Sequence, residues 1–265
     1  MAQRRRPKLG QHFLANAAYR RRIAEALELR ADDLVIEIGA GRGAMTELLA
    51  ERAKRVIALE LDAALAASLA EKLKAKPQIE VRQADILKAD LAALCREHQS
   101  EKCFVFGNLP YYITSPILHR LFGFWRSIRA MALLVQREVA ARLTATPGTR
   151  AYGYLSVLTQ LYSQPRIVLS VPPGAFVPAP KVQSALVRFR MQVGEGPALP
   201  QAEAALLAFV KRCFAQKRKN LVNNLTRTYP RERVERALAA LNLPATLRAE
   251  QLELNQLISL FERLA

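Results

Sequence analysis

The sequence predicts an α/β fold whose mostly parallel sheet carries helices on both faces, followed by a small all-helical domain. Three observations lead to this prediction. Short apolar runs alternate with helix-like patterns through the first part of the chain, as in strand–helix–strand units. The runs are almost continuously apolar, which is typical of strands buried on both sides of a sheet. Beyond residue 200 no convincing strand pattern remains.

The first strands are expected to be parallel, with helices between them. Residues 153–163 predict a further helix, and IVLSV (167–171) and SALVRFR (184–190) predict two strands that close the sheet with an antiparallel edge. The parallel strands are expected at 34–38, 55–60, 79–83, 103–107 and 130–136, and the helices at 44–53, 63–74, 115–125 and 137–144.

Two domains are expected, one covering residues 1–192 and the other residues 201–265. The segment MQVGEGPALP (191–200) between them is rich in glycine and proline, which indicates a linker. A chain of 265 residues is long enough for one large and one small domain. The second domain carries amphipathic helical patterns and basic residues, so we expect a helical domain that binds RNA.

The charge of the chain indicates a polyanionic partner. The formal net charge is +17, and an excess of this size favours nucleic acid over the alternative of a solvated basic surface without a partner. Residues 1–22 contain seven basic residues and no acidic one, and KRCFAQKRK (211–219) forms a second cluster. The residues expected to hold RNA phosphates are Arg4, Arg5, Arg6, Lys211, Arg212, Lys217, Arg218 and Lys219.

The composition argues against several other classes. No stretch reaches the roughly 18 consecutive apolar residues of a membrane span, and no apolar segment of a signal peptide follows the basic N-terminus. Three scattered cysteines and three histidines fit neither a disulfide framework nor a zinc site. We therefore expect a cytoplasmic protein without a metal. A monomer is the expectation, although the sequence does not determine the oligomeric state.

A glycine-rich turn follows the first parallel strand. The segment EIGAGRG (37–43) has glycines at alternate positions, which allow a tight turn and a close approach of the backbone to a ligand. Its G-x-G-x-G spacing differs from the G-x-G-x-x-G of dinucleotide-binding proteins. Taken alone, this segment fits an ordinary turn as well as a ligand-binding loop.

Acidic residues follow the next two strands. Glu60 ends the second strand, where a carboxylate accepts the hydroxyls of a ribose; it could instead cap the next helix, although Asp62 is better placed for that. Asp85 follows the third strand, where it could accept a hydrogen bond from an adenine amino group or serve only as a turn residue. Because the three features occur at successive strand ends, together they predict a cofactor that contains adenosine but no pyrophosphate.

The segment GNLPYY (107–112) follows the fourth strand at the same edge of the sheet. The exocyclic amine of adenine is a poor nucleophile, and the amide oxygen of Asn108 and the carbonyl of Leu109 are suited to accept its two hydrogens and aim it at an electrophile. Pro110 stiffens the turn, and Tyr111 offers a ring on which a base can stack. A strand-terminating turn with core tyrosines remains the alternative for an isolated N-x-P-Y.

Taken together, these segments resemble the ribosomal RNA adenine dimethyltransferase family, and most closely its bacterial small-subunit branch. The resemblance implies a Rossmann-like class I methyltransferase with a mostly parallel seven-stranded sheet and S-adenosylmethionine as cofactor. It covers nearly the whole chain in order. The segments that carry it are GQHFL (10–14), EIGAGRGAMTELL (37–49), ELD (60–62), QAD (83–85), GNLPYYITSPIL (107–118), QREVAARL (136–143), YGYLSVLTQ (152–160), VPPGAFVPAPKVQSALV (171–187) and FAQKRKNLVNNL (214–225).

The resemblance also implies roles for individual residues. Of the GQHFL segment, His12 and Leu14 are expected to contact the cofactor, although asparagine is common in the family where His12 stands. The other implied cofactor contacts are Gly39 and Gly41 at the methionine part, Glu60 at the ribose, Asp85 at the adenine and Asn108, which both pockets share. The implied catalytic residues are Asn108, Leu109, Pro110, Tyr111 and Phe176, the last covering the target base opposite Tyr111.

The resemblance implies in-line transfer of methyl groups to N6 of two adjacent adenosines near the 3′ end of small-subunit (16S) rRNA, without a metal. Three alternatives remain. One is the resistance-type methyltransferase of large-subunit rRNA, which the segments YGYLSVLTQ and FAQKRKN disfavour. Another is a non-catalytic RNA-binding factor, which the intact N-L-P-Y segment disfavours. The last is a nicotinamide oxidoreductase, for which the glycine spacing is wrong.

Overall fold

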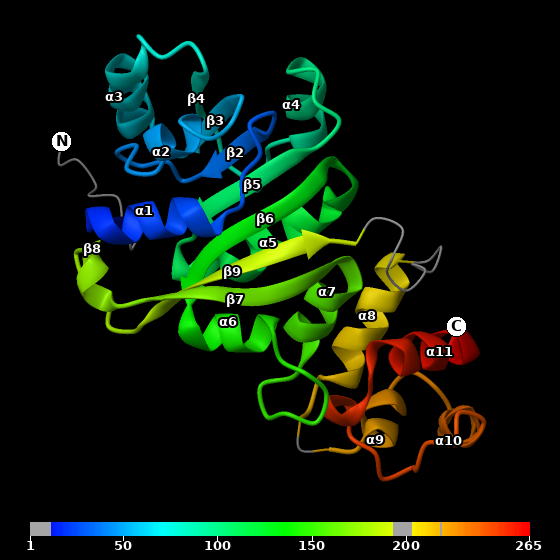
Figure 1. Cartoon of the computed structure of the whole chain (residues 1–265). Helices are drawn as coiled ribbons and strands as arrows, with labels where there is room; N and C mark the ends of the chain where they lie inside the picture. Colours follow the sequence, from blue (N-terminus) through cyan, green and yellow to red (C-terminus); the bar gives the residue numbers. More distant parts are fainter. Residues whose placement is uncertain (1–11, 193–202, 218) are drawn as a thin grey trace, which may run out of the picture. The chain divides into compact units, whose positions relative to one another are not determined.

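The computed structural model describes residues 12–192, 203–217 and 219–265 (Figure 1). The chain forms two compact units, one of residues 1–140 and 166–191 and the other of residues 141–165 and 192–265. The second unit therefore contains residues 141–165 in addition to the predicted C-terminal helices. Its internal bonds explain this, because the Gly148 N–H donates to the Glu250 carbonyl (2.7 Å) and the Lys217 ammonium donates to the Arg150 carbonyl (3.0 Å).

A seven-stranded sheet has the order β4-β3-β2-β5-β6-β9-β7. The pairs β4–β3, β3–β2, β2–β5 and β5–β6 are parallel, and β9 runs antiparallel to β6. This confirms the predicted mostly parallel sheet. The strands are β2 (Leu34–Ile38), β3 (Arg55–Glu60), β4 (Ile79–Gln83), β5 (Cys103–Asn108), β6 (Ile128–Gln136), β7 (Ser163–Val171) and β9 (Ser184–Met191).

Alternation along the central strands divides their side chains between the two faces of the sheet. Val35, Phe104 and Phe106 belong to one buried cluster, which includes Ile23 of α1 and Leu49 of α2. These contacts hold α1 and α2 on that face. The helices of the first unit are α1 (Ala17–Ala26), α2 (Thr46–Ala50), α3 (Ala63–Leu73), α4 (Leu91–Glu97) and α5 (Thr114–Gly123), and α6 (Arg137–Leu143) contains residues assigned to each unit.

Short polar side chains fix where these helices begin. The Asn16 side chain accepts hydrogen bonds from the backbone of Ala18 and Tyr19, and Asp62 and Asp90 cap α3 and α4 in the same way. Such caps satisfy backbone donors that have no partner inside the helix. The caps matter for the site because they set where the chain turns away from the sheet edge.

A small two-stranded sheet fastens the N-terminal segment to the first unit. β1 (Phe13–Leu14) pairs antiparallel with β8 (Phe176–Val177). The Ala175 carbonyl also accepts hydrogen bonds from the backbone of Ala15 and Asn16, at 2.9 and 3.1 Å. This pairing joins residues more than 150 positions apart in the chain.

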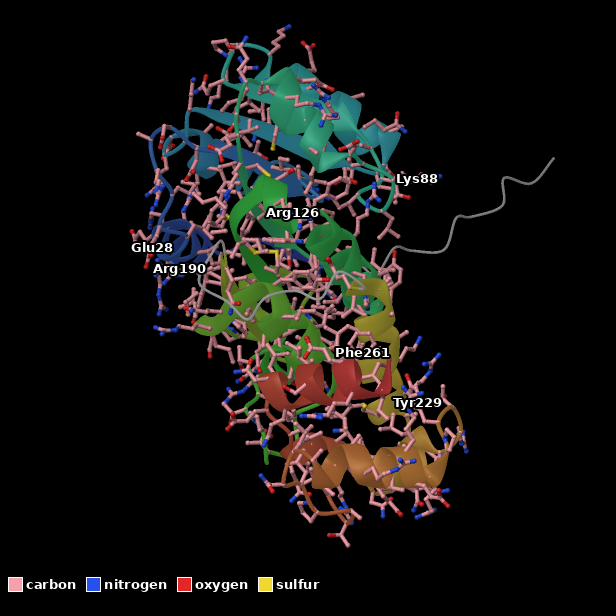
Figure 2. All side chains as sticks on the ribbon, turned by 90° about the vertical axis from the view of Figure 1, so that its right-hand side faces the viewer. Glu28, Lys88, Arg126, Arg190, Tyr229 and Phe261 are labelled. Atoms are coloured by element: carbon pink, nitrogen blue, oxygen red, sulfur yellow. The ribbon has the colours of Figure 1, made fainter. Side chains whose placement is uncertain are left out.

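The second unit is built from helices. Phe209 of α8 is fully buried there, and the centre of its ring lies 6.4 Å from that of Tyr229 and 5.6 Å from that of Phe261. Tyr229 and Phe261 are labelled in Figure 2. Between residues 203 and 265, the described segments contain no strand. The helices are α7 (Tyr154–Tyr162), α8 (Glu203–Cys213), α9 (Leu221–Leu225), α10 (Arg231–Ala239) and α11 (Leu254–Leu264).

In the part of the chain that the structure describes, no helix has the length and apolar character needed to cross a bilayer. The same residues contain no group of three or more histidine, cysteine, aspartate or glutamate side chains arranged to hold a metal ion.

Candidate active site

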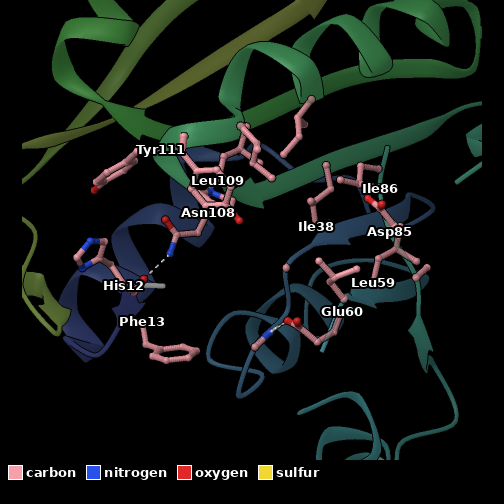
Figure 3. A pocket seen from close by; sticks show the side chains of 18 residues that line it. His12, Phe13, Ile38, Leu59, Glu60, Asp85, Ile86, Asn108, Leu109 and Tyr111 are labelled. Atoms are coloured by element: carbon pink, nitrogen blue, oxygen red, sulfur yellow. Dashed lines mark hydrogen bonds between the residues drawn. The ribbon is translucent and has the colours of Figure 1, made fainter. Parts of the chain in front are cut away.

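A cavity lies at the carboxyl ends of β2, β3, β4 and β5 (Figure 3). Residues of four successive strand ends meet there, as expected for the ligand site of an open α/β sheet. Glu60 and Asp85 lie on one side of it, while Asn108, Tyr111 and His12 lie on the other. The cavity is lined by His12, Phe13, Ile38, Gly39, Gly41, Leu59, Glu60, Leu61, Ala84, Asp85, Ile86, Asn108, Leu109, Pro110, Tyr111, Tyr112, Ile113 and Ile117.

The glycine turn after β2 needs the left-handed backbone conformation. Gly39 and Gly41 have φ of +70° and +56°, a region that other residues seldom adopt. A Cβ on Gly41 would come within 3.0 Å of the Phe13 ring, whereas one on Gly39 would meet no atom within 4 Å. Gly41 is therefore packed against its neighbour, while Gly39 leaves open space along the cavity wall.

The carboxylate of Glu60 holds this turn. Only 2% of the residue is exposed. One oxygen accepts the Gly41 N–H at 2.7 Å, and the other accepts the Asp62 N–H at 2.9 Å. Asp62, not Glu60, caps α3. Because a carboxylate oxygen has more than one lone pair, Glu60 retains the capacity to accept from a ligand hydroxyl in the cavity.

A second buried carboxyl, Glu37, lies beneath the turn. The Thr46 hydroxyl donates to it at 2.6 Å. Burial raises the pKa of Glu37 to about 8, the Thr46 hydrogen bond opposes the rise, and the nearby charge of Glu60 adds to it. Glu37 is therefore mostly protonated at neutral pH. The sequence indicates no role for Glu37, since a carboxyl within an apolar strand carries no signal of its protonation state.

The adenine side of the predicted cofactor site has one carboxylate and apolar walls. The Asp85 carboxylate accepts the Leu87 N–H at 2.9 Å, the contact expected of a turn residue. Its other oxygen makes no hydrogen bond with the residues that the structure describes. Ile38, Leu59 and Ile86 line the same end of the cavity, so a flat apolar ring would find contacts on its faces and an acceptor at its edge.

Asn108 ends β5 with its amide in a fixed orientation. Its Nδ2 donates to the His12 carbonyl at 2.9 Å, so Oδ1 is left as the acceptor on the cavity side (Figure 3). The Leu109 N–H donates to the Leu134 carbonyl at 3.1 Å on β6. Among the described residues, no donor contacts the Leu109 carbonyl. Asn108 Oδ1 and the Leu109 carbonyl, the two oxygens expected to accept from an amine, are thus not hydrogen-bonded to neighbouring described residues.

Tyr111 stands beside these oxygens on a short 3₁₀ helix (Tyr111–Ile113) that begins after Pro110. Its hydroxyl shares a hydrogen bond of 2.8 Å with the hydroxyl of Ser184, a buried residue at the start of β9. The ring is partly exposed and lines the cavity. It is not a core tyrosine, which was the alternative left open by the sequence.

His12 contacts both Asn108 and Tyr111. Its carbonyl accepts from Asn108, and its ring stacks on Tyr111 with centroids 5.6 Å apart and planes inclined by 27°. Its Nδ1 lies 2.8 Å from the Pro178 carbonyl. Because a carbonyl only accepts, Nδ1 carries the proton. The imidazole therefore faces Tyr111, while its backbone orients Asn108.

Two further predicted site residues, Phe176 and Leu14, are buried. Phe176 was expected to cover a base opposite Tyr111, but its side chain is 2% exposed, belongs to the core cluster of α1 and lines neither this cavity nor the neighbouring one. The pairing of β8 with β1 turns it inward and leaves Val177, 62% exposed, outward. Leu14 is also buried and lines only the neighbouring cavity.

That neighbouring cavity shares Phe13, Gly39, Gly41 and Asn108 with the first. Phe13, for which the sequence predicts no role of its own, therefore borders both. The second cavity is also lined by arginines of α1 and of the glycine turn. The Arg42 guanidinium lies 5.0 Å from the centre of the Phe13 ring. The lining arginines are Arg20, Arg21 and Arg42.

The structure describes four of the eight predicted phosphate-binding residues. Arg4, Arg5, Arg6 and Arg218 lie outside the described residues. Lys211 and Arg212 are exposed in the last turn of α8, and Lys217 and Lys219 are exposed beyond it. All four of these described residues belong to the second unit.

A family model described as ribosomal RNA adenine dimethylase matches residues 2–265. The chain belongs to this family. The match spans both units, and the family description agrees with the activity that the resemblance implied. This family member is thus an enzyme of the methyltransferase class with a Rossmann-like sheet.

Several proteins of known name and several solved structures are similar to this family member. The ribosomal RNA small subunit methyltransferase A of Acidobacterium capsulatum is 44% identical over 98% of this chain and 91% of its own length. The protein of the same name from Geobacillus kaustophilus is 39% identical over 97% and 90%. Among solved structures, the 23S rRNA methyltransferase ErmE has a TM-score of 0.73 at 35% identity over 95% of this chain and 99% of its own. A dimethyladenosine transferase from Plasmodium falciparum has a TM-score of 0.80 at 23% identity over 94% and 96%, which shows the shared fold.

Proposed function

We propose that this family member transfers methyl groups from S-adenosylmethionine to N6 of two adjacent adenosines near the 3′ end of 16S rRNA, giving N6,N6-dimethyladenosine during small-subunit biogenesis. The observation that carries the proposal is the combination of the family match with relatives named ribosomal RNA small subunit methyltransferase A at 39–44% identity. The free acceptor oxygens at the end of β5 support the chemistry.

The residues of the cavity fit S-adenosylmethionine. Glu60 offers acceptors for the ribose, and Asp85 offers one for the adenine amine. The open space beside Gly39 would accommodate the methionine part of the cofactor. When bound, this cofactor supplies a methyl group already activated on a positively charged sulfur. The protein's task is therefore to orient the acceptor.

On the acceptor side, Asn108 Oδ1 and the Leu109 carbonyl receive the two N–H groups of a target adenine. This draws the nitrogen toward a pyramidal geometry and points its lone pair at the methyl carbon. The new N–C bond forms as the S–C bond breaks, and the sulfur keeps the electron pair. The nitrogen becomes positively charged until it releases a proton to water, and the same oxygens stabilise that charge.

A base paired within RNA cannot reach this pocket, so the target has to leave its stack. Tyr111 then replaces some of the lost stacking. The arginines beside the second cavity support an RNA path to this site, because Arg20, Arg21 and Arg42 form no ion pair with an acidic residue of the described chain. We place further phosphate contacts on Lys211, Arg212, Lys217 and Lys219, together with Arg4, Arg5, Arg6 and Arg218.

A second candidate function is methylation of large-subunit rRNA, which the likeness to the 23S rRNA methyltransferase ErmE favours. The two functions differ in substrate. Purified protein is incubated with labelled methyl donor and separately with under-modified small and large ribosomal subunits. The proposal predicts label in the small subunit. Label confined to the large subunit would establish the second candidate instead.

A further inference from the structure

We propose that Arg20, Arg21 and Arg42 form a phosphate-binding site in the second cavity, which holds the RNA backbone beside the target adenosine. This inference rests on the proposed function and deepens it, because it assigns the strand next to the target to one set of side chains. All three arginines line this cavity, and so does Asn108, which is expected to bind the target amine. A base held at Asn108 therefore brings its neighbouring phosphates within reach of the arginines.

The acidic side chains of the second cavity do not neutralise these arginines. Glu47 is paired with Lys72 at 2.6 Å, and Glu51 is paired with Arg52 at 3.5 Å. Burial raises the pKa of Glu37 to about 8, so this carboxyl is mostly uncharged at neutral pH. Because the three guanidinium groups have no acidic partner among the described residues, the cavity carries an excess of positive charge.

The donors of two of these arginines are available to an anion. The Nε of Arg20 is buried and makes no hydrogen bond with the described residues. A buried donor without a partner is costly, above all in a charged group, so this N–H is suited to a ligand oxygen in the cavity. The Arg42 guanidinium lies 5.0 Å from the centre of the Phe13 ring. A contact with a ring face leaves the N–H groups at the edge of the guanidinium free to donate.

The glycine turn does not supply the donors itself. Free N–H groups of a glycine-rich turn bind phosphate in many nucleotide-binding proteins. In this turn, however, the N–H groups of Gly39, Gly41 and Gly43 already donate to protein oxygens at 2.7 to 2.9 Å. Guanidinium groups therefore have to bind an anion in the second cavity, and their forked donors match the oxygens of a phosphate.

The carboxylate of S-adenosylmethionine is the other anion that could reach this cavity, because Gly39 and Gly41 border both cavities. Two features favour RNA phosphate. The second cavity has a volume of about 660 Å³, against about 110 Å³ for the first, so it has room for more than the end of the cofactor. One carboxylate also offers a single charge to three guanidinium groups, whereas an RNA strand offers a charge at every phosphate.

The test compares Arg20→Gln, Arg21→Gln, Arg42→Gln and the triple variant with the wild-type protein. Arg22→Gln is the matched control, because Arg22 lies on the same helix α1, is exposed and lines neither cavity. Each protein is measured for its Kd for under-modified small subunits at several salt concentrations and for methyl transfer to them. Calorimetry without RNA gives its Kd for S-adenosylmethionine.

We expect the triple variant to lose about 10- to 100-fold in affinity for small subunits, the range that follows from lost charge-assisted hydrogen bonds. The logarithmic salt slope should fall by about 0.7 for each phosphate that is no longer held. Methyl transfer at low subunit concentration should fall by the same factor as the affinity. The Kd for S-adenosylmethionine should not change, and Arg22→Gln should match the wild type in every measurement.

Losses in the triple variant no greater than the loss in Arg22→Gln would overturn the inference and leave the proposed function intact. A raised Kd for S-adenosylmethionine in the variants would assign the arginines to the carboxylate of the cofactor, and would overturn the inference in the same way. A wild-type protein that binds S-adenosylmethionine but methylates no small subunit would overturn the proposed function, and this inference with it.

Discussion

The two halves of the cavity are built in different ways. In the half beside β2 and β3, the carboxylate of Glu60 is buried and both of its oxygens accept backbone hydrogens. In the half beside β5, Asn108, Tyr111 and His12 are partly exposed, and each side chain has one hydrogen-bonded partner among the described residues. The first half is suited to a small ligand that always binds in the same way. The second has to admit one base of a large RNA.

The comparison predicts that substitutions in the acceptor half strongly reduce methyl transfer without weakening the binding of S-adenosylmethionine. Asn108→Ala removes Oδ1 and should lower the rate of methyl transfer by about 100- to 1,000-fold, the range seen when one preorganised polar group is lost from an active site. Single-turnover transfer to under-modified small subunits measures the effect. A variant within about threefold of the wild type would mean that the amine is held by other groups.

Substitutions in the cofactor half should mainly weaken the binding of S-adenosylmethionine. Glu60→Gln keeps the shape of the side chain but replaces one carboxylate oxygen by an amide nitrogen, which cannot accept the N–H of Gly41 or Asp62. We expect the Kd for S-adenosylmethionine to rise by about 10- to 100-fold, in line with the loss of a charge-assisted hydrogen bond. Asp62→Asn, which retains an oxygen that can cap α3, is the matched control. Equal Kd values for wild type and Glu60→Gln would contradict this account.

The buried carboxyl of Glu37, below the glycine turn, makes the stability of the folded protein depend on pH. The pKa of Glu37 is raised from 4.5 to about 8 in the folded protein. Between these values the folded state holds a proton that the unfolded chain has released, so the free energy of unfolding falls as pH rises. The slope from this one group approaches about 1.4 kcal/mol for each pH unit.

Glu37→Gln tests that dependence, because the amide keeps an acceptor for Thr46 and has no charge to bury. Denaturant unfolding of both proteins at a series of pH values should show a smaller fall for the variant across the window from about pH 5 to about pH 8. Parallel profiles would show that Glu37 does not release its proton on unfolding.

The smallest expected effect for each side chain concerns the phosphate-binding residues, so four of them are replaced together. Replacing Lys211, Arg212, Lys217 and Lys219 together by alanine should weaken RNA binding and reduce its dependence on salt, by about 0.7 in the logarithmic slope for each phosphate that the variant no longer neutralises. Binding of a small-subunit rRNA fragment at several salt concentrations measures this. Lys74→Ala, which removes a lysine already paired with Glu71, is the control. An unchanged slope would show that these residues do not contact RNA phosphates.

The same contrast explains what the sequence could predict. The cofactor half follows from local patterns, because its polar residues lie at or just after the ends of strands and parallel strands end at one edge. The acceptor half depends on pairings between distant segments. The β1–β8 pairing decides that Phe176 turns inward and that His12 reaches Tyr111, and no local pattern reports it. Helix α1 was not predicted, since its run of three arginines obscures the apolar face that contains Ile23 and Ala24.

The domain boundary also depended on distant contacts. Residues 141–165 lie before and at the start of β7, so their place in the sequence predicts that they belong to the first domain. Tyr152 nevertheless packs against Phe214, with ring centroids 5.9 Å apart, and this packing helps to join the segment to the second unit. A contact of this kind has no signature in either stretch of sequence alone.

The most direct measurement maps where the methyl groups go. Under-modified small subunits are incubated with the wild-type protein and isotopically labelled S-adenosylmethionine, and the rRNA is digested and analysed by mass spectrometry. Our account predicts two neighbouring adenosines near the 3′ end, each with two labelled methyl groups on N6. Label on a ring nitrogen, on a ribose or on another base would contradict the claim that Asn108 and Leu109 present an exocyclic amine to the methyl donor.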